Sequence, residues 1–216
     1  MYPTVEARWF VPGPLPAAVR TWFDATGDAE PPLQARADLY LVSLSLDAPN
    51  VKLRAVDAGP EQRMEVKTRA GTLRTQALGP PEAQATGRIG KWQKWRFPLA
   101  EGSPADALAG GAESWLRVEK RRRSRLFVPD GDGVREATGE ELRERGCDVE
   151  LSEIGVGQAR FWSVCFEAFG PSHEGLDALL QRTAGCVLAC GEPPVLPAGR
   201  SMSYPEWIAR VGRGAG

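Results

Sequence analysis

The chain has 216 residues, a length that suits one domain, and its hydrophobic share of 42% is enough for a packed core. The formal net charge of -1 argues against a general nucleic-acid binder, which is normally basic overall. We expect a single domain over residues 1–216. No apolar run is long enough to span a membrane, so we expect no interaction with a membrane.

The four cysteines are Cys147, Cys165, Cys186 and Cys190. They have neither CxxC spacing nor the density of a disulfide framework, so we interpret them as structural thiols rather than metal ligands. Reduced thiols favour the cytoplasm.

Alternation of apolar and polar residues predicts about eight strands, within residues 4–10, 37–45, 51–54, 64–69, 92–97, 115–127, 147–154 and 160–169, with a further short strand at 72–78. Helical spacing predicts helices at 16–24 and 172–190. Capping-box spacing predicts a short acidic helix at 138–145 and a last helix that opens at Ser203 and Glu206. The C-terminal helices therefore begin at about residue 172. Residues 101–114 are rich in glycine, alanine and serine and predict a loop.

The segment 129–133 begins like a calcium loop but lacks the required glycine at the sixth position, which is Arg135. Its Asp-Gly pairs are typical of tight hairpins, and we interpret it as a turn.

The strand at 115–127 has an unusual charge density. Read at period two, Arg117, Glu119, Arg121 and Arg123 share one face, with Leu116 and other aliphatic residues on the opposite face. On this reading, the alternate cations of the strand face solvent near its rim; they are Lys120 and Arg122.

Other strands repeat this pattern, with charge opposite an aliphatic face. The charged faces together carry Glu6, Arg8, Lys52, Arg54, Glu65, Lys67, Arg69, Lys94, Arg96, Arg117, Glu119, Arg121, Arg123, Asp148, Glu150 and Glu167. One explanation is an open sheet with a solvated face. The other, which the arginine and glutamate content favours, is an α+β fold in which about eight antiparallel strands close into a barrel, with charge inside and helices packed outside.

Charges enclosed in a barrel need partners. Bases outnumber acids by ten to six in this set, so the missing partner should be an anion. Arginine and lysine match phosphate oxygens, while carboxylates bind Mg²⁺ or Mn²⁺, which bridge phosphates. A small triphosphate-containing anion with a divalent metal would satisfy both sets.

At this point the sequence resembles the triphosphate tunnel metalloenzyme (CYTH) superfamily, over most of the chain. The resemblance is carried by Val51-Lys-Leu-Arg54, Glu65-Val-Lys67-Thr-Arg69, Arg117-Val-Glu119-Lys-Arg121, Asp148-Val-Glu150, the strand ending at Glu167 and Asp38-Leu-Tyr40. It implies an eight-stranded antiparallel tunnel and a metal-dependent phosphohydrolase that acts on an inorganic or organic triphosphate.

The resemblance also implies roles for the charged residues. Glu6, Glu150 and Glu167 would hold the metal and position water. The triphosphate would be bound by Arg8, Lys52, Arg54, Lys67, Arg69, Lys94, Arg96, Arg117, Arg121 and Arg123, with support from Glu65, Glu119 and Asp148. The chain departs from the family's Glu-x-Glu-x-Lys signature, where it has Thr4, Glu6 and Arg8. The loss of the first glutamate removes a metal or metal-water ligand.

Other functions stay open. Thr4 favours a non-catalytic protein that binds polyphosphate or a phosphorylated metabolite, and a class IV adenylate cyclase is a weaker alternative. The run from Lys120 to Arg125 could be an exposed nucleic-acid patch, although its alternation makes this the second choice. A phosphate loop is absent, and His173 is the only histidine, which disfavours a catalytic triad.

Overall fold

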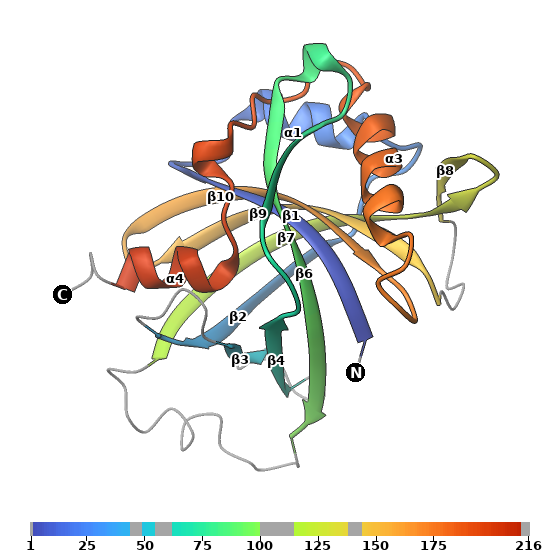
Figure 1. Ribbon diagram of the computed structural model, residues 1–216. Coiled ribbons are helices and arrows are strands. Elements are labelled where there is room, and N and C mark those ends of the chain that lie inside the picture. Colours follow the sequence, from blue (N-terminus) through green and yellow to red (C-terminus); the bar gives the residue numbers. More distant parts are fainter. Residues whose placement is uncertain (1, 44–48, 55–61, 100–114, 138–143, 213–216) are drawn as a thin grey trace.

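A computed structural model describes residues 2–43, 49–54, 62–99, 115–137 and 144–212 (Figure 1). Within these residues the strands form one antiparallel sheet. Its strands are β1 (Tyr2–Pro12), β2 (Leu33–Leu41), β3 (Asn50–Arg54), β4 (Arg63–Arg69), β5 (Arg74–Leu78), β6 (Ala85–Pro98), β7 (Trp115–Asp130), β8 (Gly133–Glu136), β9 (Gly146–Val156) and β10 (Ala159–Phe169).

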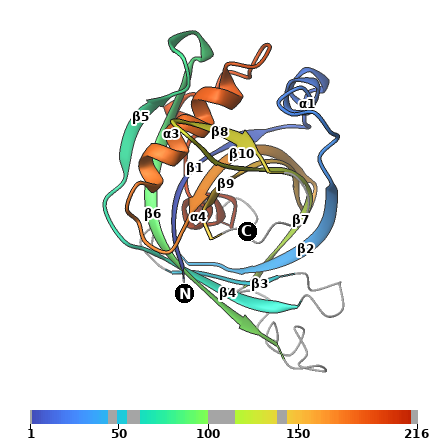
Figure 2. The same cartoon turned by 90° about the vertical axis from the view of Figure 1, so that its right-hand side faces the viewer.

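Eight of these strands close into a barrel. Neighbours follow the order β1-β10-β9-β7-β2-β3-β4-β6, and β6 pairs back with β1 to complete the ring (Figure 2). β5 extends the sheet from β6, and β8 pairs with β7. Closure leaves the eight barrel strands paired on both sides, and the predicted α+β barrel is confirmed.

The larger hydrophobic core lies outside the ring. Apolar residues on one face of β1, β9 and β10, such as Val5, Val149 and Phe166, pack against α1 (Ala17–Asp24) and α3 (Leu176–Leu188). The helices present apolar stripes to them that include Phe23 and Leu180. Because the apolar face of these strands is occupied from outside, their alternate charged residues point into the barrel.

A smaller core closes one end of the barrel. Inward residues at this end are apolar and pack on Trp207 and Ile208 of α4 (Tyr204–Gly212). The predicted capping box opens this helix: the Ser203 backbone N–H donates to Glu206 Oε2 at 2.8 Å, and the Glu206 N–H donates to Ser203 Oγ at 3.5 Å. Two 3₁₀ turns, η2 (Pro81–Ala83) and η4 (Ala198–Arg200), complete the described elements.

Several local predictions can be compared with the structure. The segment 129–133 is the β7–β8 hairpin turn, with Gly131 at a φ of 53°, as expected. Most of the predicted acidic helix (138–143) and the predicted loop at 101–114 lie outside the described residues. The four cysteines form no disulfide. None of the helices described here is long and apolar enough to cross a membrane.

Candidate anion-binding site in the barrel

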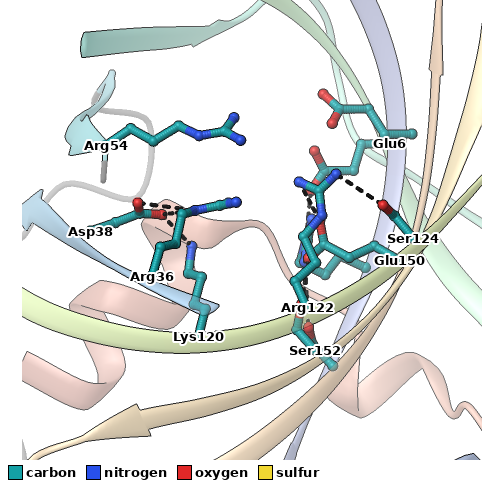
Figure 3. A network of polar contacts seen from close by, with 12 residues as sticks. Glu6, Arg36, Asp38, Arg54, Lys120, Arg122, Ser124, Glu150 and Ser152 are labelled. Atoms are coloured by element: carbon teal, nitrogen blue, oxygen red, sulfur yellow. Dashed lines mark hydrogen bonds and ion pairs between the residues drawn. The ribbon is translucent and has the colours of Figure 1, made fainter. Parts of the chain in front are cut away.

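A central cavity of about 60 Å³ lies inside the barrel, lined mainly by charged side chains. Eight are cationic: Arg8, Arg36, Lys52, Arg54, Lys67, Lys94, Lys120 and Arg122. Four are carboxylates: Glu6, Glu65, Glu150 and Glu167. Figure 3 shows part of this lining, with Arg54, Arg36 and Lys120 facing Arg122, Glu150 and Glu6 across the cavity.

Arg8 on β1 links two of the carboxylates. Its Nε donates to Glu6 at 3.1 Å and its Nη1 to Glu150 at 2.9 Å. Glu150 also pairs with Arg122 Nη1 at 3.3 Å and accepts a hydrogen bond from Ser152 at 2.8 Å. Burial opposes ionisation of Glu150, but the charges of Arg8 and Arg122 outweigh it and hold its pKa well below the ordinary value.

Glu65 on β4 is surrounded by four cations. Its carboxylate oxygens lie 2.9 Å from Lys52 Nζ, 2.8 Å from Arg63 Nε, 3.4 Å from Arg54 Nη1 and 3.6 Å from Arg96 Nε. Burial alone would raise the pKa of Glu65, but the lysine charges and hydrogen bonds around it lower the pKa far below its ordinary value. The cations on this side of the cavity therefore share one counterion.

Lys67 on β4 lies between two carboxylates from β1 and β10. Its ammonium donates to Glu6 and, at 3.0 Å, to Glu167. Glu6 and Glu167 are direct cross-strand partners, which brings both carboxylates to one point. Burial would lower the pKa of Lys67, but Glu167 and Glu6 outweigh it and raise the pKa.

Two further lysines are buried less favourably. Lys120 donates to Asp38 at 3.0 Å and to the Tyr40 hydroxyl, and burial still lowers its pKa to about 8. Burial likewise lowers the pKa of Lys52 to about 8, despite its contact with Glu65. For both ammonium groups, the free-energy cost of burial exceeds the stabilisation from their carboxylate partners, so an additional anion would stabilise their charged forms.

Nine predicted site residues line the central cavity: Glu6, Arg8, Lys52, Arg54, Glu65, Lys67, Lys94, Glu150 and Glu167. Asp148 and Arg96 lie in a neighbouring cavity of about 350 Å³, the mouth cavity, which also contains Tyr2, Thr4 and Phe169. Arg69 packs over the ring of Trp92, with its Cζ 5.5 Å from the ring centroid.

The predicted orientation of β7 is wrong. Arg117, Glu119 and Arg121 line a cleft on the outer wall of the barrel, beside Leu15 and Phe161. Arg123 has the same parity on this unbroken strand and also points outward. The residues that line the central cavity are the alternate ones, which had been expected to face solvent: Lys120 and Arg122.

The physical reason lies in the α4 end of the barrel. Val118 shares a face with Lys120 and is fully buried, but it packs against the core that contains Tyr40 and Trp207 inside the barrel. Val118 of β7 therefore lies inside the barrel, whereas Val5 and Ala7 of β1 lie outside it.

Arg36 was not among the predicted site residues. It lines the central cavity and pairs with Asp38 at 3.2 Å, two residues further along β2. The period-two spacing of Arg36, Asp38 and Tyr40 contained this signal, but the predicted strand began one residue too late, at 37.

Carboxylates suitable for a metal occur as a pair. In the part of the chain that the structure describes, no three carboxylate, thiol or imidazole groups lie close enough to hold a metal ion. Glu6 and Glu167 nevertheless converge on one cationic atom, Lys67 Nζ. Mg²⁺ is commonly held by one or two carboxylates together with substrate phosphates, so this pair fits such an ion.

Comparisons with known proteins identify the fold. No protein-family model and no curated protein matches the sequence. Among solved structures, the chain is similar to the PH1012 protein from Pyrococcus horikoshii OT3, with a TM-score of 0.52 and 11% identity over 95% of this chain and 98% of that one. At this identity the similarity establishes the fold and nothing further. The closed barrel and its charged interior thus form a CYTH-like tunnel fold, as the resemblance predicted.

Two looser similarities were also found. A conserved hypothetical protein from Pyrococcus furiosus gives a TM-score of 0.47 at 12% identity, covering 94% of this chain and 98% of that one. The S. pombe Pct1 RNA triphosphatase, in complex with the Spt5 CTD, gives a TM-score of 0.37 at 9% identity, covering 84% and 80%. Overlaps this loose carry no weight for the function of this chain.

Proposed function

We propose that the protein binds a short triphosphate-containing anion, inorganic or organic, in the central cavity and hydrolyses it with Mg²⁺ or Mn²⁺. The observation that carries the proposal is the charge of the cavity, where eight cationic side chains face four carboxylates. Electrostatic attraction is stronger in such an interior than in water, and a polyanion would supply the missing counter-charge.

The arrangement of the cations suits a phosphate chain. They come from six strands and surround the cavity, as the oxygens of a triphosphate would require. The buried Nε atoms of Arg54 and Arg122 have no hydrogen-bond partner among the described residues. Guanidinium groups bind phosphate oxygens through two parallel N–H bonds, so these arginines have donors to spare for the ligand.

The carboxylate pair of Glu6 and Glu167 would hold the metal ion. A divalent ion held by this pair would supply positive charge for phosphoryl transfer. Glu150 pairs with Arg8 and Arg122, which supports a role for it other than metal binding. We infer that Glu150 orients these two arginines toward the phosphates.

Lys67 has two states in this scheme. With the cavity free of ligand, its ammonium is held by Glu6 and Glu167. If the two carboxylates held a divalent cation, the Lys67 ammonium would be displaced by charge repulsion and would be available to donate to a phosphate oxygen. Metal and triphosphate would therefore bind cooperatively.

A non-catalytic anion-binding protein is the second candidate, and Thr4 favours it. The Thr4 hydroxyl is buried without a hydrogen-bond partner among the described residues, at the position of the family's first glutamate. If the wild-type protein binds triphosphate without turnover, Thr4→Glu is expected to introduce metal-dependent hydrolysis.

The test combines calorimetry with phosphate release. Tripolyphosphate is expected to bind, and tripolyphosphate, thiamine triphosphate and ATP are assayed for phosphate release with Mg²⁺ or Mn²⁺. Glu167→Gln should abolish metal-dependent release yet retain triphosphate binding, since it removes a metal ligand and no cation. Absence of turnover with every substrate, together with tight binding, would reject the hydrolase in favour of the binding protein.

Neighbouring arginines on β7 supply a matched control. Arg122→Ala should weaken tripolyphosphate binding about 10- to 150-fold, because hydrogen bonds to charged groups contribute roughly 1.5–3 kcal/mol. Arg121→Ala removes the same charge from the outer wall and should leave the affinity unchanged. Equal losses in the two variants would indicate nonspecific attraction, and no loss in Arg122→Ala would exclude the cavity as the binding site.

A further inference from the structure

A separate cavity lies beside α4, the helix at one end of the barrel (Figure 1). Its volume is about 760 Å³, which is within the range of ordinary small-molecule sites. Most of the large side chains that line it are apolar: Phe10, Pro12, Leu116, Val156, Phe161, Met202, Trp207 and Val211. Among the described residues, none lines both this cavity and the central one. We call this separate cavity the α4 groove.

The aromatic wall of the α4 groove is tightly packed. The Trp207 ring stacks on Phe10, with centroids 4.7 Å apart, and lies edge to face with Phe161 at 5.3 Å. Phe10 and Trp207 are each 2% exposed. Because these rings hold one another in place, the wall exists before a ligand binds, and binding would require little ordering of the protein.

Every charged side chain that the structure places in the lining of the α4 groove is an arginine. The three come from different elements: Arg117 from β7, Arg200 from η4 and Arg210 from α4. Arg200 and Arg210 are exposed, and neither makes an ion pair with another described residue. The chain as a whole has a net charge of -1, so this purely cationic lining is a local feature. Complementary charge favours an anionic ligand here.

A hydrogen-bond donor in the wall of the groove also lacks a partner. Trp207 lines the groove, and its indole N–H is buried with no acceptor among the described residues. A buried donor without an acceptor is unfavourable, and a ligand oxygen that reaches this N–H would accept its hydrogen bond. The N–H and the arginines therefore favour the same kind of ligand, an anion with acceptor oxygens.

The apolar wall discriminates between anions. The backbone amides of an acidic peptide would lose hydration against it, which is costly. A hydrocarbon chain has no such groups, and each of its buried CH₂ groups is favourable. A second copy of this chain, in a two-fold contact, would bring the same three arginines against the groove, and like charges oppose that association. The lining thus suits a hydrocarbon chain with an anionic head.

We propose that the α4 groove binds a medium-chain fatty acid. The hydrocarbon chain lies on the apolar wall beside Phe161 and Trp207, and the carboxylate pairs with Arg200 and Arg210. This site is independent of the proposed triphosphate function, because it uses a different cavity and different residues.

The first test titrates dodecanoate into the wild-type chain by calorimetry, below the critical micelle concentration. Binding should saturate at one molecule per chain. Octanoate should bind at least about tenfold more weakly, since each buried CH₂ strengthens binding by up to about fourfold. Dodecyltrimethylammonium, which has the same chain and a cationic head, should not bind. Equal affinity for the cationic analogue, or binding of dodecanoate that does not saturate, would refute the proposal.

Variants of exposed residues test the carboxylate contact without disturbing the core. The double variant Arg200→Ala with Arg210→Ala should weaken dodecanoate binding roughly 2- to 30-fold, the range for the loss of two exposed ion pairs. The matched control, Arg135→Ala with Arg182→Ala, removes the same charge from exposed residues of β8 and α3 outside the groove and should have no effect. Equal affinities of these two variants would overturn the assignment of the head group.

Gln158→Glu provides an independent variant with the opposite charge. Gln158 is an exposed lining residue in the β9–β10 turn, so the new carboxylate would repel dodecanoate. Dodecanoate affinity should fall roughly twofold to fivefold, at an unchanged melting temperature. An increase in dodecanoate affinity would contradict the proposed position of its carboxylate.

Competition separates this site from the central cavity and from other occupants. Tripolyphosphate should not displace dodecanoate, and displacement would overturn the proposal. An acidic, leucine-containing peptide that binds where dodecanoate does not would identify a peptide site instead. A ligand-free dimer that dissociates in the Arg200 and Arg210 double variant would identify a second copy as the occupant. Both outcomes overturn the proposal, whereas failure of tripolyphosphate to bind would reject only the proposed function.

Discussion

Glu65 provides the sharpest prediction, because its removal should destabilise the protein and strengthen anion binding at the same time. Its side chain is almost fully buried, and its residue exposure is 1%. Four cations within 3.6 Å share this one carboxylate. Glu65→Gln keeps the size of the side chain and removes the charge, which leaves these cations without their common counterion.

The expected magnitude follows from this geometry. Removal of one partner from a buried ion pair costs about 3–5 kcal/mol, since the remaining charge is buried without compensation. A protein of this length loses roughly 2–4 °C of melting temperature per kcal/mol, so we expect a decrease of about 6–20 °C. Control measurements use Glu119→Gln, which removes an exposed carboxylate from the outer wall and should change stability by less than about 0.5 kcal/mol.

Triphosphate should reverse this destabilisation. The released donors of Lys52 and Arg54 become available to phosphate oxygens, and we expect affinity to rise about tenfold or more, from roughly 1.5–3 kcal/mol per charged hydrogen bond. Thermal denaturation with and without tripolyphosphate measures both effects, since a ligand that binds only the folded state raises the melting temperature. The reasoning is refuted if Glu65→Gln loses affinity for tripolyphosphate, or if its stability equals that of Glu119→Gln.

Two further predictions concern the buried lysines and the closure. Burial lowers the pKa values of Lys52 and Lys120 to about 8 from the ordinary value of 10.5, so triphosphate affinity should fall as pH rises above about 8. Triphosphate binding at pH 8 should be accompanied by proton uptake. Calorimetry in buffers of different ionisation enthalpy measures this uptake. The unfolded chain binds more protons than the folded chain between these values, so ligand-free stability should rise across that interval, and a fall would contradict the lowered pKa values. Trp207→Ala should lower the free energy of unfolding by about 3–5 kcal/mol, because Trp207 is only 2% exposed in the core around α4. Urea denaturation measures this loss. A loss below about 1 kcal/mol would show that α4 contributes little to the stability of the barrel.

Much of the barrel could be predicted from the sequence, because β1, β3, β4 and β10 alternate between one apolar and one polar face. On β1, the apolar face with Val5 and Ala7 is buried under the outer helices, so Glu6 and Arg8 had to point inward. Burial of apolar surface is the dominant favourable term in folding. Where only one face of a strand is apolar, the alternation in the sequence therefore predicts which face packs in the core. Seven of the nine predicted residues that line the central cavity lie on these four strands.

The orientation of β7 could not be decided in the same way. Both of its faces carry arginines, and its apolar residues Leu116 and Val118 pack on α4 inside the barrel. Periodicity states which residues share a face, but it does not state which face is enclosed. The position of α4, a segment distant in sequence, reversed the assignment for Arg121 and Arg122.

The sequence by itself therefore determined which residues share each strand face, and that the charged faces carry more bases than acids, because period-two alternation and composition are local properties. Tertiary structure alone decided which carboxylates converge, that Lys67 lies between Glu6 and Glu167, and that one end of the barrel is filled. These features depend on strand register and on the docking of α4, which are fixed by contacts between residues far apart in the chain.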